Sequence, residues 1–274
     1  MRAPATACTA LVAALAVALA AGCRSTTSVP QPEAVDLGVE EDVAIGRAVA
    51  PRFAKLAGGP LADLAIQVYV RAVGERVARS TPARALPYEF NVLDSGAPGA
   101  YALPGGPVYV TRGLLARLRS EGQLAAALAH QLAHINAGHA GQALRDRLGA
   151  AALGDVLLAA SDTAGRGDSA ARALDRAAAA IRDLRYDPEA ERDADRLGLD
   201  YMVAAGYNPG EAVRFLNLCV AMTAADAPGP ACLAPGRDGR AEAVEAAVDR
   251  KYQDRAGRVA DEEYGREVLD RLKR

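Results

Sequence analysis

Apolar residues recur at helical spacing along most of the chain. The pattern predicts helices over residues 38–56 and 62–80, which a glycine–proline break separates. Aromatic and β-branched residues alternate over 86–93 and predict a strand, and a second short strand is predicted over 108–111. A glycine-rich segment with a predicted turn over 96–99 lies between the two strands. Many helices around two or three strands indicate the α+β class.

The second half of the chain reads almost entirely as helix. Residues 121–136 are apolar nearly all round, which predicts a buried helix. The other helices predicted here cover 141–184, with an interruption near 164–168, then 189–205, a segment that opens at Pro209, 240–250 and 256–273.

The start of the chain is typical of an exported protein. Arg2 precedes an apolar run over residues 7–21, which is too short to span a bilayer comfortably and predicts a secretory signal over 1–22. The small residues before Cys23 resemble the bacterial lipobox, in which the cysteine carries lipid. An ordinary signal peptide cut near Gly22 is the alternative.

These features divide the chain into four parts. After the signal peptide, 1–22, we expect a lipidated tether over 23–37, a main domain over 38–250 and a C-terminal helix over 251–274. The predicted location is the bacterial cell envelope, with the lipid at Cys23 as the membrane anchor. Arginine rather than aspartate after the cysteine favours the outer membrane, facing the periplasm.

Two further cysteines, Cys219 and Cys232, would remain in this oxidising compartment. A disulfide between them would close a short loop. Two buried thiols without a bond are the alternative, and the sequence leaves both open.

Composition narrows the class of protein. Hydrophobic residues make up 51% and charged residues 24% of the 274 residues, which excludes general disorder and a polytopic membrane protein. The 32 basic and 34 acidic residues give a net charge of −2 and are spread along the chain. Because no basic stripe is present, we expect no nucleic-acid partner.

All three histidines, His130, His134 and His139, lie within ten residues. His130 and His134 are four apart on the predicted helix, so both rings lie on one face. With this spacing a helix presents two imidazoles to one zinc ion. We therefore predict a metal site, with two buried structural histidines as the alternative. On a continuing helix His139 would lie on another face, and we expect it to pack beyond the helix end.

A tetrahedral site needs a further ligand from elsewhere in the chain. Glu191 and Asp195 are also four residues apart and share one face of the helix predicted over 189–205. Glu191 can bind metal while Asp195 orients a ligand histidine. A solvated acidic helix face is the alternative, and spacing alone leaves both open.

Four motifs in order resemble the HtpX and CAAX-prenyl-protease superfamily of zinc metallopeptidases, and most of all its periplasmic lipoproteins and its mitochondrial Oma-type branch. The motifs are GAYALPGG over Gly99–Gly106, VTRGLL over Val110–Leu115, HQLAH over His130–His134, and ExxAD with its following glycine over Glu191–Gly198. The resemblance runs from about Gly38 to Val248.

This resemblance implies a mainly helical zincin-type (gluzincin) metallopeptidase domain with a small β-sheet and an HxxxH active-site helix. It implies one Zn²⁺ per chain, held by His130, His134 and Glu191, with Asp195 supporting a ligand. The segment Gly99, Ala100, Tyr101 and Ala102 corresponds to the strand expected to run beside an extended substrate.

The chain departs from the family at residues that matter for catalysis. The family's HExxH glutamate, which takes a proton from the zinc-bound water, is Gln131 here, and an amide has no basic lone pair near neutral pH. Gly99 replaces an asparagine of the substrate strand. The family's downstream histidine, which caps or gates the site, aligns with Ala234, with Arg240 after it.

The first functional hypothesis is a zinc-binding, lipid-anchored envelope protein that hydrolyses peptides poorly or not at all and binds extended or misfolded envelope polypeptides. The alternative is an active zinc metalloendopeptidase in envelope protein quality control, in which Glu121 or an acidic residue within 187–195 replaces the missing base. A third hypothesis is a structural protein without metal.

Overall fold

The structure is a computed structural model of the chain that describes residues 38–82, 86–161, 167–224 and 239–273. The predicted signal peptide, the tether and Cys23 lie outside the described residues. Cys219 is buried in a helix, whereas Cys232 lies outside the described residues, as do Leu233, Ala234 and Pro235 of the downstream motif.

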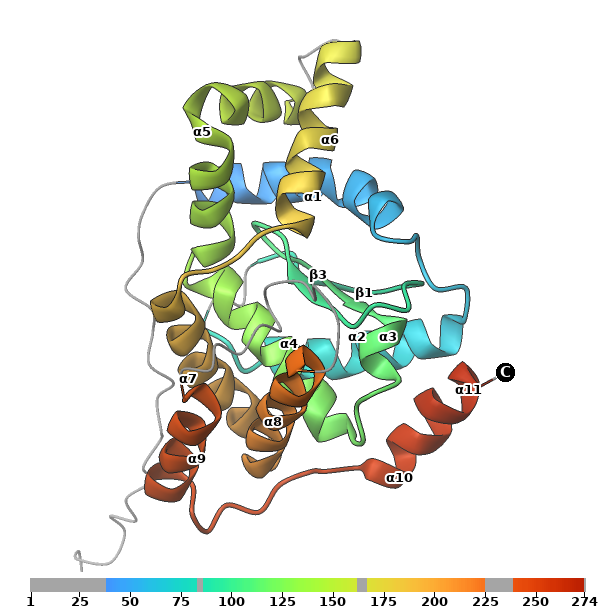
Figure 1. Cartoon of the computed structure of the whole chain (residues 1–274), viewed down its shortest axis with the longest axis vertical. Helices are drawn as coiled ribbons and strands as arrows, with labels where there is room; N and C mark the ends of the chain where they lie inside the picture. Colours follow the sequence, from blue (N-terminus) through green and yellow to red (C-terminus); the bar gives the residue numbers. More distant parts are fainter. Residues whose placement is uncertain (1–37, 83–85, 162–166, 225–238, 274) are drawn as a thin grey trace, which may run out of the picture.

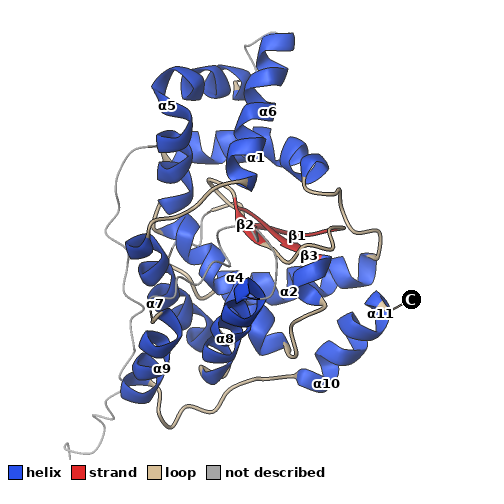
Figure 2. Cartoon of the chain, viewed as in Figure 1, coloured by secondary structure: helices blue, strands red, loops and turns tan. Residues whose placement is uncertain are grey.

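The described residues form helices around one small sheet (Figures 1 and 2). The helices are α1 (Val39–Leu56), α2 (Leu64–Ala78), α3 (Arg112–Leu115), α4 (Glu121–Asn136), α5 (His139–Ala160), α6 (Asp168–Arg182), α7 (Pro188–Ala204), α8 (Gly210–Ala224), α9 (Arg240–Lys251), α10 (Asp261–Tyr264) and α11 (Asp270–Leu272), with a π-helical turn at Gly265–Leu269 between the last two. The predicted α+β, mainly helical fold is confirmed.

The sheet has three strands in the order β1-β3-β2. β1 (Glu89–Leu93) runs parallel to β3 (Pro107–Thr111), and β2 (Ala100–Ala102) runs antiparallel to β3. Successive side chains of a strand point to opposite faces of the sheet. Helices cover both faces, so both sets of side chains are buried.

Alternation along β3 shows the two layers. Val108 and Val110 belong to the main core, which α2, α4 and α7 share, whereas Tyr109 belongs to a second core with α1, α5 and α6. The ring of Phe53 on α1 packs against Tyr109 with 5.1 Å between ring centroids. The sheet therefore separates two helical layers, with α1 on one side and α2 on the other (Figure 1).

Helix α4 lies at the centre of the main core (Figure 1). Its N-terminus is capped by the Ser120 hydroxyl, which accepts a hydrogen bond from the backbone N–H of Gln123. Every residue from Glu121 to Ile135 is buried. A helix that is buried all round needs neighbours on every side, and α2, α5, α7, α8 and β2 supply them.

Helix α7 packs most extensively against α4. Asp187 caps its N-terminus by accepting hydrogen bonds from two backbone N–H groups, and Pro188 occupies the first turn. Gly198 lies where the two helices cross: a Cβ atom there would come within 3.0 Å of the backbone nitrogen of His130. This close approach lets α7 bring its acidic face to the histidines of α4.

The C-terminal part differs from the prediction of one helix over 251–274. Residues 252–260 are not helical, and the terminal helical segment begins at Asp261. Arg258 forms a β-bridge with Tyr207 and ion-pairs with Glu121 on α4. These tertiary contacts fix a non-helical path for the segment. None of the described helices is long and apolar enough to cross a membrane.

Candidate metal centre

Helix α4 presents its two histidines to one point inside the core. His130 and His134 are 4% and 0% exposed. Their Nε2 atoms lie 3.1 Å apart, with the two rings edge to face. The spacing of four residues places both rings on one face of the helix, as the sequence predicts. The two buried imidazoles therefore direct their Nε2 atoms towards one shared position.

Helix α7 adds a carboxylate to the same position. Oε2 of Glu191 lies 3.4 Å from Nε2 of His130, and Oε1 lies 3.9 Å from Nε2 of His134. Glu191 is 5% exposed, and its Oε1 has no hydrogen-bond partner among the described residues. A buried carboxylate oxygen without a partner is costly unless a cation satisfies it.

The three donors fit a zinc ion. Their ligand atoms lie within 4.8 Å of one another, and all three residues are buried. Two atoms about 2.1 Å from a zinc ion at the tetrahedral angle are about 3.4 Å apart, which is close to the separations of 3.1, 3.4 and 3.9 Å found here. Two imidazoles and one carboxylate are also a donor set that zinc binds in catalytic sites.

Asp195 and Arg240 support this donor set from behind. Nδ1 of His130 lies 3.0 Å from Oδ1 of Asp195. Arg240, which is buried at the start of α9, donates two hydrogen bonds to Asp195, of 2.6 and 2.7 Å. Its remaining terminal nitrogen lies 2.8 Å from Oε2 of Glu191. One guanidinium therefore fixes both carboxylates of α7 relative to His130.

The surroundings of the two histidines shift their pKa values in opposite directions. Burial alone would lower the pKa of His130, but the carboxylates of Asp195 and Glu191 raise it to about 9. Burial, with the nearby charge of His130, lowers the pKa of His134 well below its usual value. Burial would raise the pKa of Asp195, but Arg240 and His130 hold it below its usual value. Asp195 is therefore ionised at neutral pH.

Sequence reasoning missed two neighbours of His134. The Tyr186 ring, on the loop before α7, stacks on the His134 ring with centroids 3.7 Å apart and 13° between planes. His139 lies beyond the end of α4, as expected, but its Nδ1 lies 3.2 Å from Nδ1 of His134. An aromatic residue before a helix start is common, so the sequence carries no distinct signal for the first contact.

Gln131 lies on α4 between the two histidines in sequence. Its side chain is 1% exposed, and its amide oxygen has no hydrogen-bond partner among the described residues. The Gln131 side chain is therefore inside the core, on the helix that carries two of the donors. An amide here can take part in hydrogen bonds but cannot take up a proton at neutral pH.

The predicted substrate segment forms the edge strand β2 and the residue before it. Gly99 accepts a hydrogen bond from the backbone N–H of Thr111, and Ala100 and Ala102 are buried. The Tyr101 ring packs against Phe53 in the second core, with centroids 5.1 Å apart. The strand packs against α4, the helix that carries the two histidines.

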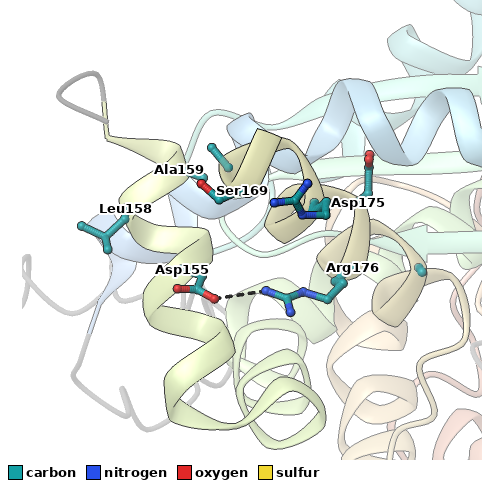
Figure 3. A pocket seen from close by; sticks show the side chains of 9 residues that line it. Asp155, Leu158, Ala159, Ser169, Asp175 and Arg176 are labelled. Carbon is teal, nitrogen blue, oxygen red and sulfur yellow. Dashed lines mark hydrogen bonds and ion pairs between the residues drawn. The ribbon is translucent and has the colours of Figure 1, made fainter. Parts of the chain in front are cut away.

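A cavity lies away from the metal centre. It measures about 720 Å³ and lies between α5 and α6, where Asp155 ion-pairs with Arg176 and Leu158 lines the wall (Figure 3). None of the metal-site residues lines it.

Comparison with known proteins agrees with the geometry. Residues 65–251 match the peptidase family M48. The β-barrel assembly-enhancing protease of Escherichia coli K12 is 28% identical over 164 residues, which are 57% of this chain and 33% of that protein. The mitochondrial metalloendopeptidase OMA1 of Schizosaccharomyces pombe is 30% identical over 145 residues, which are 53% of this chain and 41% of that protein.

The chain spans about a third of the length of its bacterial relatives. The family match, in contrast, covers more than half of this chain and includes α4, α7 and all three donors. This family uses zinc, and the described residues contain a His-His-Glu site that can hold the ion. The chain belongs to peptidase family M48.

Proposed function

We propose that this chain is a zinc-binding member of family M48 that hydrolyses peptides poorly or not at all. The observation that carries the proposal is Gln131, a buried amide next to His130 on the helix that bears the donors. A general base at this position must accept a proton from water and pass it to the leaving amine, and an amide can do neither.

Zinc, when bound, lowers the pKa of a coordinated water towards neutrality. The chain's own residues then have separate roles. His130, His134 and Glu191 bind the ion, and Asp195 holds the ring of His130 through Nδ1. Gln131 can orient a water by hydrogen bonding, but it moves no proton. The site keeps metal binding and lacks proton transfer.

Three of the carboxylates that could replace the missing base are engaged elsewhere. Glu121 lies nine residues before His130, which is about 13 Å along a helix, and it accepts hydrogen bonds from Tyr69, Tyr207 and Arg258. Asp187 caps α7, and Asp195 is bound by Arg240. These contacts favour the impaired enzyme over the alternative of an active metalloendopeptidase.

Restoring the base tests the proposal. With zinc-loaded protein and β-casein as an unfolded substrate, we expect Gln131→Glu to cleave about 10²- to 10⁴-fold faster than the native chain. Adding His134→Ala to that variant removes a donor and is expected to abolish the gain.

Two results would count against this account. Zinc-dependent cleavage by the native chain at the rate of Gln131→Glu would favour the active enzyme. A Gln131→Glu variant that binds zinc and stays inactive would show that the amide is not what limits the rate.

We also propose that extended or misfolded envelope polypeptides bind along β2. The strand lies at the edge of the sheet and packs against α4, so an added strand would run close to the donors. Hydrogen exchange at residues 99–102 should slow when carboxymethylated, unfolded casein is added. Protection elsewhere in the protein, with none over these residues, would overturn the proposal.

The proposed location is the outer membrane of a bacterium, with a lipid on Cys23 and the domain facing the periplasm. The motif before Cys23 supports this, and the Escherichia coli relative is named for enhancing β-barrel assembly. We extend that name to this chain only as a role in envelope protein quality control. Cys23→Ala should move the protein from the detergent phase to the aqueous phase, and an unchanged partition would contradict lipidation.

A further inference from the structure

The start of α5 folds back towards the metal centre. Helix α4 ends at Asn136, and Gly138 has φ of 73°, the left-handed conformation that glycine adopts without strain. This turn changes the direction of the chain, and His139 becomes the first residue of α5. The His139 ring thereby reaches the side of His134 that a continuing helix would not offer.

His139 contacts His134 at the nitrogen that faces away from the other two donors. Nδ1 of His139 lies 3.2 Å from Nδ1 of His134, while Nε2 of His134 faces His130 and Glu191. The other nitrogen of His139, Nε2, faces Oδ2 of Asp193 at 3.9 Å. The three groups form a row that leads away from the metal centre.

The positions of the protons follow from this row. A metal-ligating histidine binds through a lone pair, so Nε2 of His134 is unprotonated and its Nδ1 carries the proton. The group opposite Nδ1 must then accept a hydrogen bond, so Nδ1 of His139 carries a lone pair. The proton of a neutral His139 ring is therefore on Nε2, on the side of Asp193.

We infer that His139 is a positioning residue that fixes the ring and tautomer of the ligand His134, and that the nearby negative charge of Asp193 favours the proton of His139 on Nε2. The inference rests on the zinc site proposed above. His130 has a carboxylate partner of its own, because Asp195 lies beside its Nδ1. The two ligand histidines therefore have different partners at Nδ1. His130 has the carboxylate of Asp195, and His134 has the imidazole of His139.

Zinc affinity tests the inference without an activity assay. Competition with a chelator should show zinc bound 10- to 100-fold more weakly by His139→Ala than by the native protein, about the usual effect of removing such a partner. His139→Asn should recover most of the affinity, because its amide oxygen stands close to the place of Nδ1. Asp193→Asn should have a smaller effect than His139→Ala.

A matched control separates the local effect from a general one. Asp146 on α5 is also acidic and accepts a hydrogen bond from Gln142. Asp146→Asn should therefore leave zinc affinity unchanged. Thermal unfolding of the metal-free variants shows whether each one folds, and His139→Asn tests the inference even if His139→Ala does not.

A spectroscopic measurement adds a second test. Long-range ¹H–¹⁵N spectra of the zinc-loaded protein should show His134 protonated at Nδ1 and His139 at Nε2. The opposite tautomer of His139, or native zinc affinity in His139→Ala, would overturn the inference while leaving the zinc site intact. Failure of the native protein to bind zinc would overturn both.

Discussion

Asp195 and Arg240 show how single side chains prepare the metal centre. A buried carboxylate beside His130 accepts two hydrogen bonds from a buried guanidinium, which also reaches Glu191. Removing one member would leave a buried charge without its partner, which is costly. The donors are therefore held in place by the protein itself before any metal binds.

The charge of His130 gives a prediction at this scale. Because neighbouring carboxylates outweigh burial and raise its pKa to about 9, His130 is protonated in the metal-free protein at pH 7.5. His134 is neutral there, since burial lowers its pKa. At pH 6, where His130 is likewise protonated and a zinc-bound water still keeps its proton, zinc binding should therefore release about one proton per chain. The contribution of His130 to the release should disappear as the pH rises through 9.

Calorimetry measures this release. Zinc titrations at pH 6 in buffers of different ionisation enthalpy give the number of protons as a slope. A slope of zero would contradict the predicted charge of His130, and a slope near two would show that His134 is charged as well.

At the scale of elements, the crossing of α4 and α7 sets the distance between the donors. Gly198→Ala would place a Cβ atom within 3.0 Å of the backbone of α4. We expect the helices to separate, with a loss of about 1–3 kcal/mol in the free energy of unfolding and weaker zinc binding. Urea unfolding and chelator competition measure the two effects.

Gly154 on α5 provides the matched control. It is also helical, and an added Cβ atom would meet nothing within 4 Å. Gly154→Ala should be neutral or stabilise by up to about 1 kcal/mol. Equal effects of the two substitutions would show that the crossing is not tightly packed.

The elements also show what a sequence can and cannot predict. Periodicity and spacing predicted α4 with close to its observed ends. Spacing together with the family resemblance predicted the donor set, because each motif lies within a single helix, α4 or α7. The stacking of Tyr186 on His134 depends on how a loop returns to α4, and no local pattern reports it. The C-terminal helix predicted over 251–274 begins later, at Asp261, because tertiary contacts of Arg258 prevail over local propensity in the segment before it.

Across the molecule, Glu121, the first residue of α4, connects this helix to the C-terminal segment through Arg258. The carboxylate is 2% exposed and accepts hydrogen bonds from Tyr69, Tyr207 and Arg258. Burial would raise the pKa of Glu121, but these hydrogen bonds and Arg258 hold it below its usual value of 4.5. The ionised carboxylate therefore stabilises the fold.

This pKa gives a stability prediction with a defined sign. A lowered pKa means that the contribution is complete above about pH 4.5 and is lost as the pH falls through the lowered value. Glu121→Gln should lower the free energy of unfolding by about 1–3 kcal/mol at pH 7. The difference from the native protein should shrink below pH 4, and a constant difference in urea unfolding across this range would contradict the assignment.

The overall arrangement places the buried metal centre away from the helices α5 and α6. The donors lie inside the main core between α4 and α7, while α5 and α6 extend from one end of the molecule (Figure 1). The cavity of about 720 Å³ is lined by residues of these two helices and by none of the donors (Figure 3). Gln131 is likewise buried on α4 and does not line this cavity.

The most direct test of the account is the zinc content of the purified protein. Elemental analysis should find one zinc per chain in the native protein and in Gln131→Glu, because the amide is not a donor. His130→Ala should lose the metal. A native protein without zinc, or a His130→Ala variant that keeps a full equivalent, would contradict the central claim that His130, His134 and Glu191 form the metal site.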